Sequence, residues 1–425
     1  MDRRAFLTTT ASATGLAVLT AVPTSGLATK PRPRVGLPTV EPVEANRLVR
    51  GFGVCAHPNF NTATYQHTTA WVERLAGTNA SYFRGMYTPN LPSVRFATTE
   101  ARRLGVGWLA TVAPENWSVT GAQLIARLEH LRDNAADVVI AIEGINEPNH
   151  ERSGGPPPAD WPQRTVAIQK VIWDFVQATP ALAHVQVIGP SLHASVSTVH
   201  EDHLRLGHLG CQNYFDYAGL HRYFGGRYPD HLVDERLGWI KEAYGDRPTW
   251  VTETGYTNCV ANTKQHKPVP ENVSAAYGPL CLLEFAIRGC RSTRYELLDD
   301  PDENAKDVVE SNFGLWRTPS LDPGTWTEKP EATVMRDFLS FLEDPGPHYT
   351  PAPVQLRVTA PDNVKNLVVG KRNGSATLLL WQNTAIFDPN SQTAITVPSA
   401  SVGVKTASGF RAVNVPAGEV VRLRL

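Results

Sequence analysis

A (β/α)₈ barrel followed by a small antiparallel β-sandwich is the fold class that the sequence predicts, and three observations predict it. From about residue 50, apolar runs of strand length alternate with helical patterns. The first and eighth runs, at Phe52 and Thr293, begin 241 positions apart, which is roughly 34 residues for each of seven units. After Pro345-Gly346-Pro347 the helical patterns stop and short alternating strands follow.

The barrel is predicted over residues 49–347. Its eight strands are predicted at 52–56, 81–84, 107–112, 138–145, 185–189, 217–221, 249–252 and 293–298. Apolar residues recur at helical spacing between these runs, for example Leu124, Leu128, Leu131 and Ala135. Residues 330–342 are predicted to form the last helix, which closes the barrel.

Residues 348–425 are predicted to form the β-sandwich. Its strands are predicted at 355–359, 366–371, 376–381, 393–397 and 419–425. A β-domain of this size has a small core, so we expect it to pack on the barrel. No row of exposed aromatic residues stands out, and bracing the barrel is favoured over binding glycan as its role.

The first 28 residues resemble a twin-arginine export signal. Arg3 and Arg4 precede a mildly apolar stretch at 11–22, and small residues at 26–28 suit cleavage. An ordinary secretory signal or an uncleaved anchor is the alternative, although the apolar stretch is short and rich in Thr and Ser for a membrane span. Residues 29–48 contain several prolines and predict an extended lead-in. We therefore expect export to a periplasmic, cell-wall or extracellular location, without membrane insertion once the signal is removed.

Composition excludes several classes of partner. The formal net charge is −1 and no basic stripe follows the N-terminus, which argues against nucleic acid and anionic membranes. The cysteines, five in all, leave at least one thiol free, and a disulfide among Cys259, Cys281 and Cys290 stays open. Their spacing does not fit a zinc site, and residues 200–203 lack the spacing of a zinc-protease helix. We expect no metal, no cofactor and a monomer.

Two carboxylates carry the predicted chemistry. Glu147 follows the fourth strand and Glu253 ends the seventh, at the edge where barrel enzymes place their active sites. Glycoside cleavage needs one carboxyl group to protonate the leaving oxygen and another to meet the positively charged anomeric centre. At a separation of about 5–5.5 Å the second attacks directly and configuration is retained. Because two such close carboxyls do not ionise together easily, we expect one acid with a raised pKa and one carboxylate.

The tetrapeptide Asn146-Glu147-Pro148-Asn149, with Glu253 on the seventh strand, resembles the 4/7 superfamily (clan A) of retaining glycosidases. Together with residues 328–332, Glu-Lys-Pro-Glu-Ala, it looks most like families 39 and 5. The resemblance implies that Glu147 is the general acid/base, that Glu253 is the nucleophile, and that Asn146 binds the sugar 2-hydroxyl of a β-linked substrate. Ile145 departs from the aromatic residue that these families commonly carry before the Asn.

Further side chains are candidates for the substrate site. Arg84 ends the second strand and is predicted to hydrogen-bond Glu253, with a surface salt bridge as the alternative. His221 and Tyr223 follow the sixth strand and are predicted to orient Glu253, with a core histidine as the alternative for His221. The remaining candidates are His57, His193 and Trp316.

The sequence therefore predicts an exported, metal-independent retaining glycoside hydrolase that acts on a carbohydrate. Two alternatives stay open. A glycan-binding protein on a barrel without activity would bind sugar but not turn it over. A transglycosylase would use the same carboxylate pair and transfer the sugar to an acceptor other than water. Sugar identity, linkage and the choice between exo and endo action do not follow from these residues.

Overall fold

The computed structural model describes residues 36–60, 64–113, 117, 121–151, 155–264, 266–299 and 307–425. Leu37–Leu425 form one unit that contains both the barrel and the C-terminal β-domain. The predicted export signal, residues 1–28, and the first residues of the predicted lead-in lie outside the described residues.

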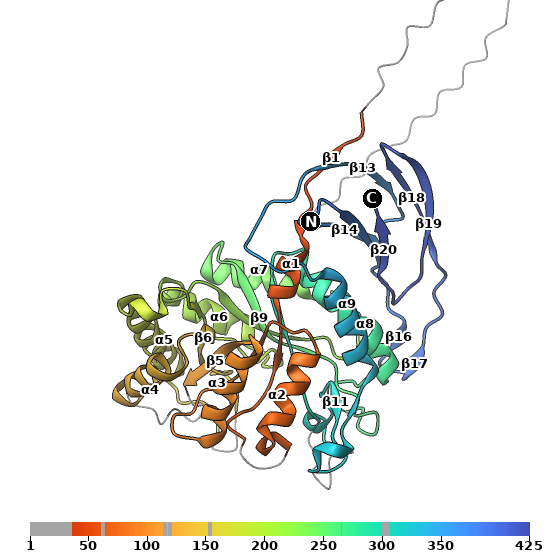
Figure 1. The fold of residues 1–425 in the computed structure, drawn as a ribbon. Coiled ribbons are helices and arrows are strands. Elements are labelled where there is room, and N and C mark those ends of the chain that lie inside the picture. The colour runs from red at the N-terminus through yellow and green to blue at the C-terminus, as the bar shows by residue number, and fades with distance from the viewer. Residues whose placement is uncertain are drawn as a thin grey trace, which may run out of the picture. The chain divides into compact units, whose positions relative to one another are not determined.

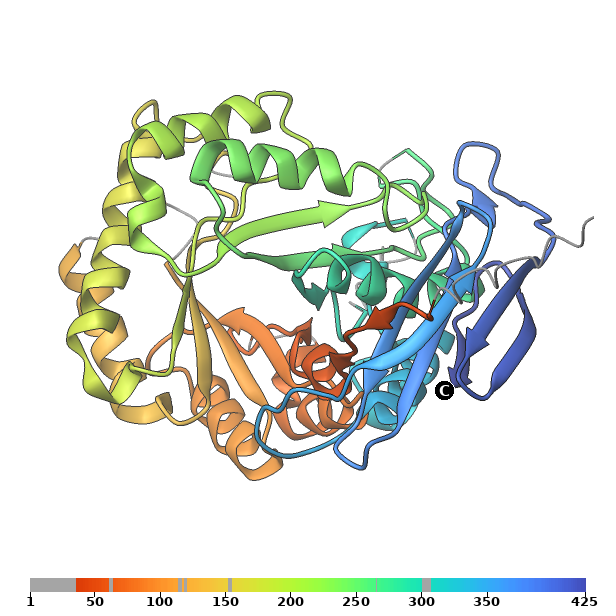
Figure 2. The ribbon, with the colours of Figure 1, turned by 90° about the horizontal axis from the view of Figure 1, so that it is seen from above.

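Parallel strands form the predicted barrel in the described part of the chain (Figure 2). In chain order they are β3 (Phe52–Cys55), β4 (Tyr82–Met86), β5 (Gly107–Ala113), β6 (Val139–Ile145), β7 (Gln186–Ile188), β8 (Ala218–Tyr223), β9 (Thr249–Gly255) and β10 (Arg291–Arg294). Their hydrogen-bonded order is β7-β6-β5-β4-β3-β10-β9-β8. A parallel bridge between Ile188 and Tyr217 joins β7 to the start of β8 and closes the ring. The (β/α)₈ fold class is therefore confirmed.

The eighth strand lies earlier in the chain than predicted, since β10 covers Arg291–Arg294 and the prediction covered 293–298. The prediction extended the strand too far because Leu297 and Leu298 are buried apolar residues, although they belong to no strand. Leu297 N still donates to Cys55 O of β3 at 3.0 Å, whereas Glu296 N donates to Phe313 O of a later loop at 3.2 Å. That loop carries a short hairpin, β11 (Trp316–Arg317) and β12 (Thr327–Glu328).

Helices cover the outside of the strands (Figures 1 and 2). In the described residues they are α2 (Thr68–Gly77), α3 (Pro92–Leu104), α4 (Gly121–Ala135), α5 (Trp161–Ala178), α6 (Val199–His208), α7 (Val233–Tyr244), α8 (Glu271–Ala286) and α9 (Pro330–Leu342). The predicted apolar stripe of α4 is buried as expected, at Leu124, Leu128, Leu131 and Ala135. The last predicted helix matches α9, which begins with proline, a residue whose fixed φ suits the first helical turn.

The C-terminal β-domain consists of two four-stranded sheets. One has the order β1 (Thr39–Val40), β13 (Val354–Thr359), β18 (Ala400–Thr406), β19 (Gly409–Val415), and the other the order β2 (Val43–Glu44), β14 (Val364–Gly370), β15 (Ala376–Gln382), β20 (Val421–Arg424). Leu356, Val368, Leu378 and Val404 belong to its hydrophobic core. The predicted sandwich is present, but the hairpin of β18 and β19 was missed. Most of β19 is exposed, so its sequence shows little apolar alternation.

Two other parts of this domain differ from the prediction. The strand predicted at 393–397 is reduced to β17 (Thr393–Ala394), which pairs with β16 (Phe387–Asp388). The lead-in is not a free extended segment: β1 pairs with β13, β2 pairs with β14, and α1 (Ala45–Arg50) follows. Both short strands lie at sheet edges, where a neighbouring proline without an N–H group is tolerated. The barrel is thus preceded and followed in sequence by strands of the same domain.

The β-domain packs on α8 and α9 of the barrel (Figure 1). Glu284 of α8 is fully buried, and its carboxylate accepts from Trp381 Nε1 at 2.8 Å and from Lys365 Nζ at 2.7 Å. Arg288 Nη1 donates to the same carboxylate at 2.7 Å. On α9, the guanidinium of Arg422 lies 4.4 Å from the ring centre of Phe341. The expectation that the domain packs on the barrel is met by these contacts.

All five cysteines are free thiols, so the disulfide that the sequence left open does not form. Within the described residues, no helix combines the length and the apolar character that crossing a membrane requires.

Candidate active site

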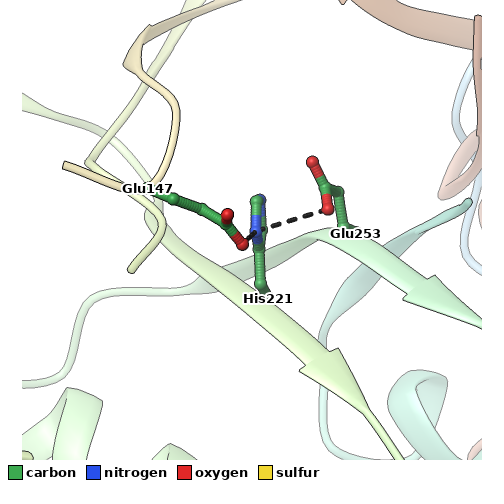
Figure 3. Close-up of side chains that lie close together, drawn as sticks. All are labelled: Glu147, His221 and Glu253. Carbon is green, nitrogen blue, oxygen red and sulfur yellow. Dashed lines mark hydrogen bonds and ion pairs between the residues drawn. The ribbon is translucent and has the colours of Figure 1, made fainter. Parts of the chain in front are cut away.

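A cavity of about 1140 Å³ opens at the carboxyl ends of the barrel strands. Most of the predicted site residues line it: Glu147, Glu253, Asn146, Arg84, Tyr223, His57 and His193. His221 is buried just beneath, between the two carboxylates (Figure 3). The barrel therefore gathers side chains that are separated by up to 196 positions in the chain, from His57 to Glu253.

The two predicted catalytic carboxylates face each other across this cavity. His221 Nδ1 lies 2.8 Å from Glu147 Oε1 and 3.4 Å from Glu253 Oε2 (Figure 3). One oxygen from each carboxylate and one ring nitrogen of His221 all lie within 4.8 Å of one another. This separation matches the short distance of retaining glycosidases, since inverting enzymes need about 6.5–9.5 Å to admit a water molecule.

The backbone of Glu147 is in the left-handed region, with φ of 46°. Its N–H donates to Ser191 O at 3.1 Å, which ties the end of β6 to the segment after β7. A non-glycine residue in this region is strained, and such strain is typical of functional sites whose surroundings hold it in place. This backbone conformation makes the chain turn directly after β6.

Arg84 holds the nucleophile candidate. Its Nη1 donates to Glu253 Oε1 at 2.7 Å and its Nη2 donates to Asn146 Oδ1 at 2.7 Å. Arg84 is only 5% exposed, so it is not a surface salt bridge. Burial alone would lower the pKa of Arg84, but Glu143 and Glu253 hold that pKa well above its ordinary value.

Glu143, which was not among the predicted site residues, completes this arrangement. It is fully buried in β6, and its Oε2 accepts from Arg84 Nε at 2.6 Å. Its other oxygen accepts from Ser191 Oγ at 2.7 Å and from Thr252 Oγ1 at 3.0 Å. Burial would raise the pKa of Glu143, but Arg84 and His221 lower it below its ordinary value. The sequence did contain a signal for this role, since a carboxylate inside a buried strand requires a cation beside it.

Tyr223 and His221 lie at the end of β8, where Tyr223 bonds Glu253 and His221 bonds Glu147. Tyr223 Oη donates to Glu253 Oε2 at 2.8 Å, so both oxygens of Glu253 accept hydrogen bonds. Burial and the charge of Glu253 raise the pKa of Tyr223 well above its ordinary value, which keeps it a donor. Burial would lower the pKa of His221, but Glu253 and the bond to Glu147 raise it. Its Nε2 is buried without a partner, so His221 is not a satisfied core histidine.

His57 and His193 lie on the cavity wall. His57 Nε2 is 3.4 Å from Glu296 Oε2, and burial alone would lower the pKa of His57 while Glu296 raises it. His193 stacks on His150 with ring centres 3.9 Å apart, and its Nε2 is 4.0 Å from Glu147 Oε2. The histidine stack beside Glu147 was missed, because each histidine alone gives no sequence signal.

Trp316 is not part of the cavity lining, which corrects its prediction as a substrate residue. It belongs to the hairpin β11–β12, where it pairs with Glu328. The guanidinium of Arg74 lies 5.1 Å from its ring centre and 4.7 Å from that of Trp326. In this hairpin the tryptophan packs against Arg74 instead of lining the cavity.

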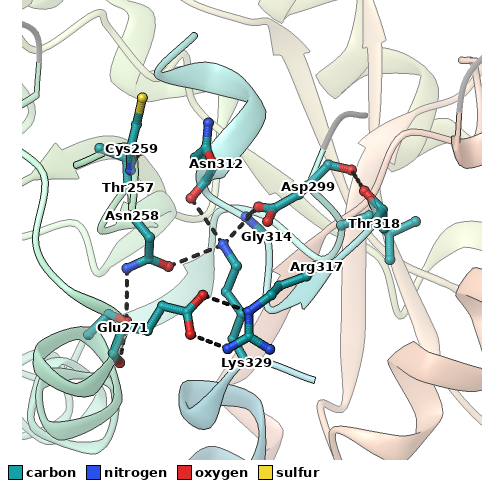
Figure 4. Close-up of polar contacts among 12 residues, drawn as sticks. Thr257, Asn258, Cys259, Glu271, Asp299, Asn312, Gly314, Arg317, Thr318 and Lys329 are labelled. Carbon is teal, nitrogen blue, oxygen red and sulfur yellow. Dashed lines mark hydrogen bonds and ion pairs between the residues drawn. The ribbon is translucent and has the colours of Figure 1, made fainter. Parts of the chain in front are cut away.

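A polar cluster surrounds the buried amino group of Lys329 (Figure 4). Lys329 Nζ donates to Asp299 Oδ1 at 2.8 Å and to Asn312 O at 3.2 Å, and Gly314 N donates to the same Asp299 oxygen at 2.8 Å. These bonds hold Phe313, whose ring centre lies 5.5 Å from that of Tyr223. Burial raises the pKa of Asp299 to about 6 against the opposing effect of Lys329.

Residues 328–332, on which part of the family resemblance rests, make buried polar contacts away from the cavity. Lys329 bonds Asp299, and Glu331 forms a buried ion pair with Arg294 at 2.6 Å. Their place in the structure is at the start of α9, behind the cavity wall.

Glu147, His221 and Glu253 have the spacing of a metal site, but the atoms that would bind a metal already make hydrogen bonds. Both Glu253 oxygens accept from Arg84 and Tyr223, and His221 Nδ1 bonds Glu147. A cation would also lie close to the Arg84 guanidinium. The arrangement suits proton transfer and nucleophilic attack better than metal binding.

No family model and no curated protein matches the chain. Among solved structures, SrfJ from Salmonella typhimurium aligns with 92% of this chain and 91% of its own, with a TM-score of 0.58 and 10% identity. A glucosidase from Croceicoccus marinus aligns with 86% and 80%, with a TM-score of 0.53 and 13% identity. Aphid myrosinase aligns with 68% and 97%, with a TM-score of 0.50 and 11% identity. At such identities the likeness shows the fold, and no assignment to family 39 or 5 is shown.

Proposed function

We propose that this protein is a retaining glycoside hydrolase in which Glu253 is the nucleophile and Glu147 the general acid/base. One observation carries the proposal: carboxylate oxygens from the ends of β6 and β9 lie within 4.8 Å of each other at the mouth of a barrel. Arg84 and Tyr223 donate hydrogen bonds to both oxygens of Glu253 and so position it for attack. Glu147 lies on the opposite wall, beside the stacked His150 and His193.

The reaction has two steps. Glu253 attacks the anomeric carbon while Glu147 donates a proton to the leaving oxygen, and the bond to the aglycone breaks. Glu147 then removes a proton from water, which attacks the anomeric carbon and releases Glu253. Arg84 and Tyr223 position the nucleophile, and His221 orients the acid/base through its 2.8 Å contact with Glu147.

The finer parts of the proposal rest on the sequence. Membership of family 39 or 5 and a β-linked substrate follow from the resemblance of residues 146–149 and 328–332. Export follows from the paired Arg3 and Arg4 at the head of an apolar segment.

Chemical rescue tests the roles of the two carboxylates separately. Wild type, Glu147→Ala and Glu253→Ala are assayed on a panel of aryl β-glycosides and β-glycans, each with and without azide. We expect azide to yield a β-glycosyl azide from Glu147→Ala and an α-glycosyl azide from Glu253→Ala, since it replaces the base-activated water in one and the nucleophile in the other.

Four outcomes contradict parts of the proposal. A first-formed sugar of inverted configuration from wild type excludes retention. Hydrolysis by Glu253→Ala at the wild-type rate excludes Glu253 as nucleophile. Products that form only when a sugar acceptor is added identify a transglycosylase, and sugar binding without turnover identifies a binding protein.

A further inference from the structure

Arg222 is a buried cation on the cavity wall that the proposed mechanism does not use. It follows His221 in β8, is 5% exposed and lines the cavity. Its Nε and Nη2 donate to the carbonyl of His231, at 3.1 Å from Nε. No carboxylate of the described residues lies within ion-pair distance of it, in contrast to Arg84, which has two. An unpaired buried guanidinium is costly, so an anion beside it is favourable.

Arg227 brings a second unpaired guanidinium to the same wall. It lines the cavity, is exposed, and forms no ion pair with any described residue. Its backbone is fixed, because Tyr256 Oη donates to Arg227 O at 2.8 Å. Arg227 Nη1 lies 3.7 Å from the position that a Cβ at Gly225 would take, and Gly225 has φ of 56°. The side chain of Arg227 therefore passes over Gly225, whose positive φ favours glycine in this turn.

The charges of Arg222 and Arg227 both affect His231. Partial burial and the charges of Arg227 and Arg222 lower the pKa of His231, which also lines the cavity. Burial, with repulsion from Arg236, lowers the pKa of Arg222 to about 10. Positive charge is therefore in excess along residues 222–231, while the carboxylates Glu147 and Glu253 are bonded to other groups.

The β-domain holds this loop in place before any ligand arrives. Asp230 Oδ2 accepts from Asn383 Nδ2 at 2.6 Å and from Lys365 Nζ at 3.4 Å. A Cβ at Gly226 would lie 2.6 Å from Pro389, which shows how closely the domain packs on the loop. A pre-formed loop loses little conformational freedom on binding, which favours selective recognition.

We propose that Arg222 and the loop 224–232 between β8 and α7 form a subsite for an anionic group of the substrate, either the carboxylate of a uronic acid or a sulfate ester. The inference rests on the proposed function, because it names the substrate class of the same cavity. Planar guanidinium groups bind both anions through paired hydrogen bonds.

Matched polysaccharides test the subsite without relying on turnover. The inactive Glu253→Gln protein is titrated with a uronic-acid polymer and its carboxyl-reduced form, and with a sulfated polymer and its desulfated form. We expect one acidic polymer to bind at least about tenfold more tightly than its neutral partner, which is the effect of one charge-assisted hydrogen bond. Whichever pair shows the preference identifies carboxylate or sulfate.

Arginine variants locate the preference. Arg227→Gln in the same background is expected to remove most of the preference and leave binding of the neutral partner unchanged. Arg247→Gln, at an exposed position before β9 and so at the opposite end of the barrel, is the matched control and is expected to bind like its parent. Because Arg222→Gln loses the bond to His231, Arg222→Lys is used beside it, with melting temperature as the check on folding.

The outcomes separate the subsite from the hydrolase. Equal binding of each acidic and neutral pair, no binding of any acidic polymer, or a preference that survives Arg227→Gln overturns the subsite. Hydrolysis of neutral glycans by wild type would then still support the proposed function. An acidic preference that depends on Arg227, in a protein that hydrolyses no substrate, supports the subsite and contradicts the hydrolase.

Discussion

Two buried glutamates, Glu253 at the barrel mouth and Glu284 at the contact between α8 and the β-domain, differ in what surrounds them. Glu284 is fully buried and receives bonds from Trp381, Lys365 and Arg288. Glu253 receives bonds from Arg84 and Tyr223, yet remains 8% exposed and lines the cavity. A carboxylate with cavity on one side is available to a ligand, whereas one enclosed by protein donors holds the structure together.

The largest expected effect is on catalysis at the mouth. Glu253→Ala is expected to lower kcat/KM on the order of 10⁴- to 10⁶-fold, as removal of a nucleophile that acts as part of a unit does. Its melting temperature should stay close to that of wild type, because the cavity lets water reach Arg84. A variant that loses stability in step with activity would make Glu253 resemble Glu284 and break the comparison.

The converse change acts on stability. Glu284→Ala leaves Lys365 and Arg288 without their buried acceptor and is expected to lower the free energy of unfolding by about 3–5 kcal/mol. Denaturant unfolding measures this, with Glu242→Ala as a control, since Glu242 is an exposed carboxylate of α7. The folded fraction should keep its kcat, and a selective loss of kcat would contradict a structural role.

A smaller effect is expected when one bond to the nucleophile is removed. Tyr223→Phe loses a charge-assisted hydrogen bond to Glu253 and should lower kcat about tenfold to hundredfold. Pre-steady-state measurement of the glycosylation step detects it. Tyr244→Phe, whose hydroxyl bonds His203 away from the cavity, is the control and should leave kcat unchanged.

The smallest effect concerns the pH dependence of stability. The pKa of Glu143 in the folded protein lies below its ordinary value of 4.5, because Arg84 and His221 outweigh the effect of burial. Its contribution is therefore complete above that value and is lost as the pH falls through the folded pKa. The difference in melting temperature between wild type and Glu143→Gln should shrink on acidification, and a constant difference would exclude this account.

Predictions from local periodicity were the most successful. Alternating apolar runs identified the strands of the barrel, and the spacing of Glu147 and Glu253 placed them at the carboxyl ends of β6 and β9. Arg84 and Tyr223 were identified by the same reasoning, from polar residues at the carboxyl ends of strands. Each of these inferences needs only the regular repeat of a βα unit.

Contacts between distant segments could not be predicted. Glu143 was not among the predicted site residues because no local pattern reveals that Arg84 reaches it. Trp316 was misplaced because the loop after β10 returns to pack on Arg74. The lead-in was taken as free because its sheet partners, β13 and β14, lie more than 300 residues later in the chain.

The sequence by itself determined the repeating βα units and the strand ends that carry the two carboxylates, because burial imposes a period that each segment records locally. Only the tertiary structure decided which side chains hold those carboxylates, which arginines remain unpaired on the cavity wall, and which strands from the two ends of the chain share a sheet. Such pairings depend on distances between segments far apart in sequence, and no local pattern encodes these distances.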